Sequence, residues 1–178
     1  MTEVQLHDKH FRPYINSKQI QQRILELAAE INRDYAELNP LFIGILNGSF
    51  IFAADLFRAI TIKAEISFIK LASYRGTSST GSVITAIGLE DNLHDRHIII
   101  LEDIVDTGRT LFSFLPVIEQ QSPASVRIAA FLSKPDARQH EVPLAYTGFE
   151  IPDKFVVGYG LDYDKLGRNL PELYILAD

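Results

Sequence analysis

The chain has 178 residues, a length typical of one domain and sufficient to bury roughly 70% of the surface that the unfolded chain exposes. Its 47% hydrophobic and 22% charged residues are ordinary for a globular protein. A net charge of −6 argues against broad nucleic-acid binding, which needs a basic surface. The absence of cysteine excludes both disulfides and thiolate metal sites.

Targeting signals are also missing from the sequence. Residues 1–10 are polar and lack the apolar core of a signal peptide. No apolar run approaches the ~20 residues that cross a bilayer. We therefore expect a soluble, cytoplasmic protein with no membrane partner.

The first clear pattern is helical. Residues 1–16 predict only a short segment packed on something larger. From Ser17, apolar residues recur at helical spacing, with Ser17 as a suitable N-cap. This pattern predicts a helix that runs to about Leu38 and stops before Pro40.

Two strand patterns follow, each with a polar segment behind it. Leu41–Leu46 predicts a strand, and the turn Asn47-Gly48-Ser49 leads into a helix over Phe50–Ile60. Lys63–Leu71 predicts a second strand, and Ser82–Gly88 a third. Between these, Ala72–Gly81 is rich in Ser, Thr and Gly, which indicates a mobile loop. The loop is either a lid that includes Tyr74 or a slack hairpin connection.

The central run begins as the apolar stretch His97–Leu101, typical of a strand buried on both faces. Glu102 and Asp103 follow, and then Asp106–Thr110, which reads Asp-Thr-Gly-Arg-Thr. We interpret this polar segment as a loop between a strand and a helix, where free backbone N–H groups can bind a phosphate. Neighbouring acids suit a magnesium ion or sugar hydroxyls. The alternative is an acidic turn that only caps the helix.

The remaining elements complete an alternating pattern. Leu111–Gln121 predicts a helix, although Pro116 lies inside it, and Val126–Leu132 predicts a buried strand. Lys134 follows that strand, a position where lysine is usually solvated. Leu173–Leu176 predicts a last short strand.

Strands and helices alternate from residue 41 to 132, which predicts a parallel sheet with helices on both faces. Ligands of such sheets bind beyond the carboxyl ends of the strands. Asn47, Tyr74, Glu102 and Lys134 all follow predicted strand ends. We expect them to converge.

The run Ile98–Thr110 resembles the phosphoribosyl-pyrophosphate motif of type I phosphoribosyltransferases. That pattern is a set of apolar residues, two acids, two apolar residues, Asp-Thr-Gly, a variable residue and Thr. Every defined position matches. The resemblance implies the fold of that family, a central mostly parallel sheet flanked by helices. It also implies one domain over residues 1–178, with a core of about 17–150 and a small hood from about 1–16 and 150–178.

Other segments resemble one branch of the family, the hypoxanthine-guanine phosphoribosyltransferases. Val157–Tyr163 is similar to their purine-site segment, Leu46–Ser49 to their pyrophosphate loop, and Ser73-Tyr74 to the start of their closing lid. With Lys134 and Arg168 in the expected order, the resemblance extends from about residue 40 to 178.

Two positions depart from this branch. Asn47 replaces its usual lysine, which removes a cation from the pyrophosphate side, and Gly160 replaces its usual alanine. The family's loop contributes backbone N–H groups through a cis peptide. The sequence alone does not decide whether Leu46–Asn47 is cis.

The resemblance implies purine salvage: transfer of the 5-phosphoribosyl group from phosphoribosyl pyrophosphate to hypoxanthine or guanine, giving IMP or GMP and pyrophosphate. The implied 5-phosphate and ribose residues are Glu102, Asp103, Asp106, Thr107, Gly108, Arg109 and Thr110. The implied purine residues are Lys134, Phe155, Val156 and Asp162, and the implied pyrophosphate residues are Asn47, Gly48, Ser73, Tyr74 and Arg168. Mg²⁺ would be bound by Glu102, Asp103 and Asp162, and Asp106 would be the general base.

The family also suggests a homodimer or homotetramer. Three alternatives remain at this stage. One is an enzyme for another base such as xanthine, and another is a non-catalytic scaffold. The third is an RNA-binding regulator of pyrimidine genes, which should show a basic face, whereas this chain has 17 Lys+Arg against 23 Asp+Glu.

Overall fold

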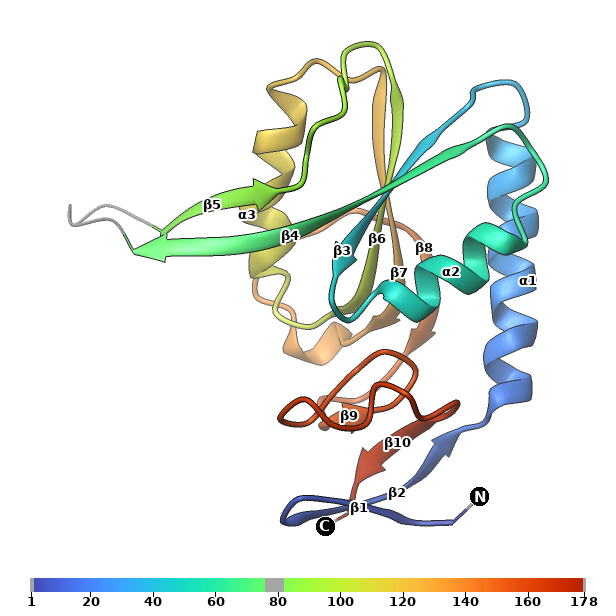
Figure 1. Cartoon of the computed structure of the whole chain (residues 1–178), viewed down its shortest axis with the longest axis vertical. Coiled ribbons are helices and arrows are strands. Elements are labelled where there is room, and N and C mark those ends of the chain that lie inside the picture. The colour runs from blue at the N-terminus through green and yellow to red at the C-terminus, as the bar shows by residue number, and fades with distance from the viewer. Residues whose placement is uncertain (1, 76–81, 178) are drawn as a thin grey trace.

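The computed structural model describes residues 2–75 and 82–177, and its largest element is a twisted sheet (Figure 1). Among the described residues this sheet has six strands in the order β5-β4-β3-β6-β7-β8. They are β3 (Leu41–Leu46), β4 (Glu65–Arg75), β5 (Ser82–Ile87), β6 (His97–Val105), β7 (Ser125–Ser133) and β8 (Leu144–Glu150). Every neighbouring pair is parallel except β4 with β5, which places the antiparallel strand at one edge.

Both faces of this sheet are covered by helices, as its apolar strands require. Ile98 and Ile100 of β6 belong to a core cluster with α3 (Arg109–Glu119). Ile99 and Leu101, which point to the opposite face, pack in a cluster with α1 (Ser17–Asp34) and α2 (Phe50–Arg58). The mostly parallel sheet with helices on both faces confirms the predicted fold class.

A second sheet joins the two ends of the chain. It contains β1 (Val4–Leu6), β2 (Lys9–Ile15), β10 (Leu173–Leu176) and β9 (Val156–Val157) in the order β1-β2-β10-β9, all antiparallel. Figure 1 shows this sheet below the arrowheads of β7 and β8, at the carboxyl ends of the parallel strands. The chain termini thus form the predicted hood.

The first helix differs from the prediction at both ends. Asn16, not Ser17, is the N-cap, because its side chain accepts a hydrogen bond from the backbone N–H of Gln19 at 2.9 Å. The Gln19 side chain accepts one from the backbone N–H of Asn16 at 3.1 Å, which completes a capping box. The helix ends at Asp34, a turn before the predicted Leu38.

The second helix, α2, also ends earlier than predicted, at Arg58 instead of Ile60. Ser49 occupies its N-cap position without a side-chain capping bond. The Ser49 hydroxyl donates instead to the carbonyl of Ile45 at 2.6 Å.

The central strand is longer than predicted. Glu102 pairs with Ala130, and Ile104 with Leu132, so β6 continues to Val105. The prediction that Glu102 and Asp103 lie in a loop is therefore wrong, because pairing with β7 persists beneath the polar side chains. The loop is short, and α3 begins at Arg109 and passes through Pro116 to Glu119.

The predicted mobile loop Ala72–Gly81 is wrong in its first part. β4 runs to Arg75 and pairs with β5, with Tyr74 opposite Val83. Residues 76–81, the rest of the predicted lid, lie outside the described residues. In the part of the chain that the structure describes, no helix is long and apolar enough to cross a membrane.

Candidate active site

The loop between β6 and α3 is held from outside by a neighbouring segment. The Arg138 guanidinium donates to the carbonyls of Val105 and Asp106 at 3.4 and 3.3 Å. The backbone N–H groups of Gln139 and His140 both donate to the Thr107 carbonyl at 3.0 Å. These bonds hold the loop against the segment that follows β7.

Gly108 caps α3 with a φ of 80°, in the left-handed region that favours glycine. A Cβ there would lie 2.6 Å from the His140 carbonyl oxygen. The glycine therefore allows the loop to turn tightly into the helix. Its neighbours Arg109 and Thr110 lie in the first helical turn, where backbone N–H groups lack helical partners and can bind an anion. The Arg109 N–H donates to the Thr107 hydroxyl at 3.4 Å.

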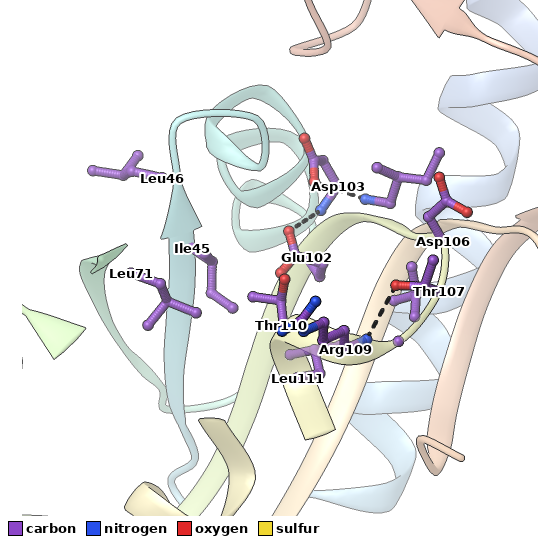
Figure 2. Close-up of a pocket in the computed structure, with 13 residues that line it drawn as sticks. Ile45, Leu46, Leu71, Glu102, Asp103, Asp106, Thr107, Arg109, Thr110 and Leu111 are labelled. Carbon is purple, nitrogen blue, oxygen red and sulfur yellow. Dashed lines mark hydrogen bonds between the residues drawn. The ribbon is translucent and has the colours of Figure 1, made fainter. Parts of the chain in front are cut away.

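A pocket of about 330 Å³ opens over this loop (Figure 2). The structure brings together in its wall all seven residues predicted for the 5-phosphate and ribose. They are Glu102, Asp103, Asp106, Thr107, Gly108, Arg109 and Thr110. The end of β3 contributes Ile45 and Leu46, and the middle of β4 contributes Leu71.

The acid pair at the end of β6 is divided between a buried and a more open side chain. Glu102 is 8% exposed, and burial, followed by the adjacent Asp103 carboxylate, raises its pKa well above the usual range. The Asp103 carboxylate accepts from the backbone N–H of Ile104 at 2.8 Å. Figure 2 shows Asp103 beside the turn after β3, and Asp106 further along the strand-to-helix loop.

The turn after β3 approaches this acid pair closely. A Cβ at Gly48 would collide with the Asp103 carboxylate, so only glycine allows the contact. The Leu46–Asn47 peptide bond is cis. Among the described residues, Asn47 and Gly48 lie beside the first pocket and do not line it.

A second pocket of about 230 Å³ adjoins the first. It is lined by all four residues predicted for the purine, namely Lys134, Phe155, Val156 and Asp162, together with Leu161. The two pockets share Asp103, Ile104 and Asp106. Two ligands bound side by side would therefore meet at this shared wall.

Lys134 lies in the second pocket and is not solvated, contrary to the usual expectation for lysine after a strand. Its side chain is 8% exposed. Its ammonium nitrogen is 3.5 Å from a carboxylate oxygen of Asp106 and 3.3 Å from one of Asp153. A hydrogen-bond donor and an acceptor thus stand side by side at the boundary of the two pockets.

The tail loop after β9 is braced internally. Arg168 forms an ion pair with Asp162 at 2.7 Å and donates to the Gly160 carbonyl at 2.6 Å. Gly160 has a φ of 102°, and a Cβ there would collide with the Gly48 carbonyl oxygen. Glycine at this position therefore lets the tail loop contact the turn after β3. Arg168 does not line either of the two pockets as the described residues form them.

The predicted metal ligands do not form a ready-made cage. No group of three His, Asp or Glu side chains among the described residues could hold a metal ion. Mg²⁺ commonly takes one or two protein carboxylates and completes its shell with substrate phosphates and water. Asp103 and Asp162, which line the second pocket, fit this mode.

Ser73 and Tyr74 lie in β4, where they pair with Ile84 and Val83 of β5.

Two residues that contribute to the site were not predicted from the sequence. Asp153 contacts Lys134, and Arg138 supports the loop. Both contacts join segments that the sequence pattern does not connect. The sequence signal for Asp153 was its position two residues before Phe155, which was predicted to bind the purine.

Comparison with known proteins agrees with this geometry. Residues 14–164 match the family model for the phosphoribosyl transferase domain. The chain is 36% identical to the hypoxanthine-guanine-xanthine phosphoribosyltransferase of Tritrichomonas foetus, covering 100% of this chain and 98% of that protein. It is 41% identical to the hypoxanthine phosphoribosyltransferase of Haemophilus influenzae, covering 90% and 92%.

Solved structures agree as well. The crystal structure of a hypoxanthine-guanine phosphoribosyltransferase from Bacillus anthracis is 34% identical, with a TM-score of 0.85 over 93% of this chain and 97% of that one. The chain therefore belongs to the phosphoribosyltransferase family, and within it to the hypoxanthine-guanine phosphoribosyltransferases.

Proposed function

We propose that the protein transfers the 5-phosphoribosyl group from phosphoribosyl pyrophosphate to hypoxanthine or guanine and releases pyrophosphate. The products would be IMP or GMP. The observation that carries this proposal is the pair of adjoining pockets, which share Asp103, Ile104 and Asp106. One pocket suits a sugar phosphate and the other a flat base.

The first pocket suits the donor substrate. The backbone N–H groups of the Asp106–Thr110 loop and the hydroxyls of Thr107 and Thr110 would bind the 5-phosphate. Glu102 and Asp103 would accept hydrogen bonds from the ribose hydroxyls. Because hydrogen bonds from Arg138 hold the loop, little conformational freedom would be lost when the phosphate binds.

The second pocket suits the edge of a 6-oxopurine that carries N7 and O6. The ring nitrogen N7 and the exocyclic oxygen O6 lie on the same edge of the purine. A protonated N7 needs a hydrogen-bond acceptor, and O6 needs a donor. Asp106 and Lys134, 3.5 Å apart, offer this pair of groups. A 6-amino base would direct its own N–H group at the Lys134 ammonium, so adenine would be rejected.

The base would be oriented by the tail. Phe155 would stack on the ring, and the backbone of Val156 would bind its far edge. Asp106 would take the proton from N7 as N9 bonds to the ribose C1′. The exposed position of Asp106 between the two pockets supports this role.

Magnesium is the cofactor that we propose, and when bound it would neutralise the charge of the departing pyrophosphate. Glu102 and Asp103 would hold one ion together with substrate oxygens, and Asp162 a second. Asn47 and Gly48 would offer backbone donors to the pyrophosphate, and Arg168 would offer a cation after leaving Asp162. Closure of a lid that starts at Ser73 and Tyr74 would exclude water from the sugar.

Xanthine is a second candidate substrate, because the full-length relative from T. foetus is named for it. A panel of hypoxanthine, guanine, xanthine and adenine, assayed for pyrophosphate release with and without Mg²⁺, tests both proposals. We expect rapid Mg²⁺-dependent turnover with hypoxanthine or guanine and little with adenine. Equal turnover with adenine, or none with any 6-oxopurine, would contradict the proposal.

A further inference from the structure

The turn between β1 and β2 contacts the tail loop that follows β9. The Tyr163 hydroxyl donates to the Asp8 carboxylate at 2.7 Å, a bond between residues 155 positions apart. The His7 ring nitrogen Nε2 lies 3.1 Å from the Asp164 carbonyl oxygen, and its ring packs edge-on against Tyr163. The hydrogen bond from Tyr163 lowers the pKa of Asp8, so Asp8 is an ionised acceptor at neutral pH.

The same contacts continue to Phe155, the residue proposed to stack on the purine. The Phe155 ring centroid is 5.8 Å from that of Tyr163 and 6.2 Å from that of Phe11. Phe11 and Tyr163 are themselves 6.1 Å apart, so the three rings form a closed triangle. Phe11 is fully buried, whereas Phe155 is 44% exposed. Phe155 is thus supported by two rings and open on the pocket side.

Phe155 needs this support, because a large side chain that is nearly half exposed keeps freedom about its χ angles. A ring stacks well on a base when its plane is already fixed, since otherwise part of the binding free energy is used to order the ring. The backbone beside it is fixed separately, because Val156 and Val157 pair with β10, and β10 pairs with β2.

We propose that the amino-terminal hairpin, β1 with β2, is a positioning element of the purine pocket, which fixes the plane of Phe155 through Phe11 and the Asp8–Tyr163 contact. The hairpin residues line neither of the two pockets among the described residues, so they act through Phe155. This inference rests on the proposed function of the second pocket.

The kinetic test compares Tyr163→Leu, which removes the supporting ring, with Tyr163→Phe, which keeps the ring and removes the bond to Asp8. Tyr163→Leu is expected to raise the KM for hypoxanthine about 3- to 10-fold, the range expected for one aromatic pair. The KM for phosphoribosyl pyrophosphate should change less than about twofold on the same scale. The KM of Tyr163→Phe for hypoxanthine should lie between that of Tyr163→Leu and that of the unsubstituted protein.

Tyr174→Phe is the matched control. Tyr174 lies in β10 of the same sheet, and its hydroxyl donates to Glu172 at 3.4 Å. Its loss should leave both KM values unchanged. An equal rise of both KM values in Tyr163→Leu, or no change in either, would overturn the inference.

A second readout does not need turnover. The chain has no tryptophan, so Phe155→Trp introduces a single indole at the stacking position. Its fluorescence anisotropy decay should show a faster local component when Tyr163→Leu is added, and little change when Tyr174→Phe is added. An unchanged decay would overturn the inference even if the enzyme is active. If the anisotropy decay changes as expected but no purine accepts the phosphoribosyl group, only the proposed function is contradicted.

Discussion

The six-stranded sheet and the four-stranded sheet contribute to the same site in different ways. In the large sheet, β6 is apolar on both faces and delivers Glu102, Asp103 and Asp106 from one continuous strand and its loop. The small sheet has strands of two to seven residues drawn from both ends of the chain. It delivers Phe155 and Asp162 through contacts between distant segments.

The two sheets position their functional side chains in two different ways. The loop between β6 and α3, proposed to bind the 5-phosphate, is determined locally, by a buried strand, a glycine turn and a helix start. The second pocket, proposed to bind the purine, depends on the pairing of β10 with β2 and β9, which joins segments far apart in the sequence. We therefore expect substitutions in the loop to impair the chemical step, and substitutions around the tail to impair binding of the base.

The largest effect is expected for Asp106→Asn in the loop of the large sheet. An amide of the same shape still accepts a hydrogen bond but cannot take a proton from N7. The kcat should fall by about 10²-fold or more, with both KM values little changed. Steady-state kinetics with both substrates measures this. Asp95→Asn, an exposed acid remote from both pockets, is the control. Unchanged turnover would remove Asp106 from the role of general base.

Next in size is Lys134→Ala, at the end of β7 in the large sheet. Without the ammonium group, the 6-oxo group of hypoxanthine loses a charged hydrogen-bond donor. The 6-amino group of adenine, itself a donor, no longer faces a second donor. The ratio of kcat/KM for adenine to that for hypoxanthine should rise about 10- to 100-fold. Lys63→Ala, on the exposed surface, should leave the ratio unchanged. If the ratio does not move in Lys134→Ala, this lysine does not bind the 6-position.

A smaller effect is expected for Asp153→Asn, which lies between the two sheets. The Asp153 side chain is 61% exposed, and one of its carboxylate oxygens lies 3.3 Å from the Lys134 ammonium nitrogen, which Asp106 also contacts. Without it, Lys134 pairs more fully with Asp106 and is less available to the base. We expect a KM for hypoxanthine raised about 3-fold and a smaller change in kcat. Asp153→Glu should restore part of the loss. An unaltered KM for hypoxanthine would show that the contact of Asp153 with Lys134 has no part in binding the base.

The smallest effect on activity is expected for Tyr146→Phe in β8, remote from both pockets. The Tyr146 hydroxyl donates to Asp34 at 2.7 Å and lowers the pKa of that carboxyl group. A lowered native pKa stabilises the fold above the unfolded value of about 3.9, and this stabilisation is lost as the pH falls through the native pKa.

At pH 7 the variant should therefore lose about 1 kcal/mol of unfolding free energy, with normal activity. The difference from the unsubstituted protein should shrink below about pH 4. Thermal unfolding at pH 7 and pH 3 measures both values. A difference that stays constant across this range would show that the hydrogen bond to ionised Asp34 is not its cause.

The same contrast explains what could be predicted from the sequence. The bounds of β3 and β10 match the predicted Leu41–Leu46 and Leu173–Leu176, because short apolar runs between turn residues permit few other structures. The seven residues predicted for the 5-phosphate and ribose share one pocket, because a strand end, a glycine turn and a helix start leave little freedom over so few residues.

The strands β1, β2, β8 and β9 were not predicted. β2 is set by its pairing with β10 at the other end of the chain, and β1 and β9 are only three and two residues long. β8 reads Leu-Ala-Tyr-Thr-Gly-Phe-Glu and has a mixed burial pattern that gives no clear alternation. Its Gly148 packs against the backbone of Phe131 in β7, a contact that no local pattern reveals. The proximity of Asp153 to Lys134 likewise arises only once the tail crosses the sheet ends.

The pairing of β2 with β10 also sets an order of assembly. During synthesis the strands of the large sheet are complete once β8 has emerged, at Glu150. β2 has no partner on its other edge until β10 follows, and closing so long a loop is slow. A growing chain can therefore form the loop of the first pocket before the second pocket is complete. Folding of the small sheet and of the tail loop after β9 is therefore the step that completes the second pocket.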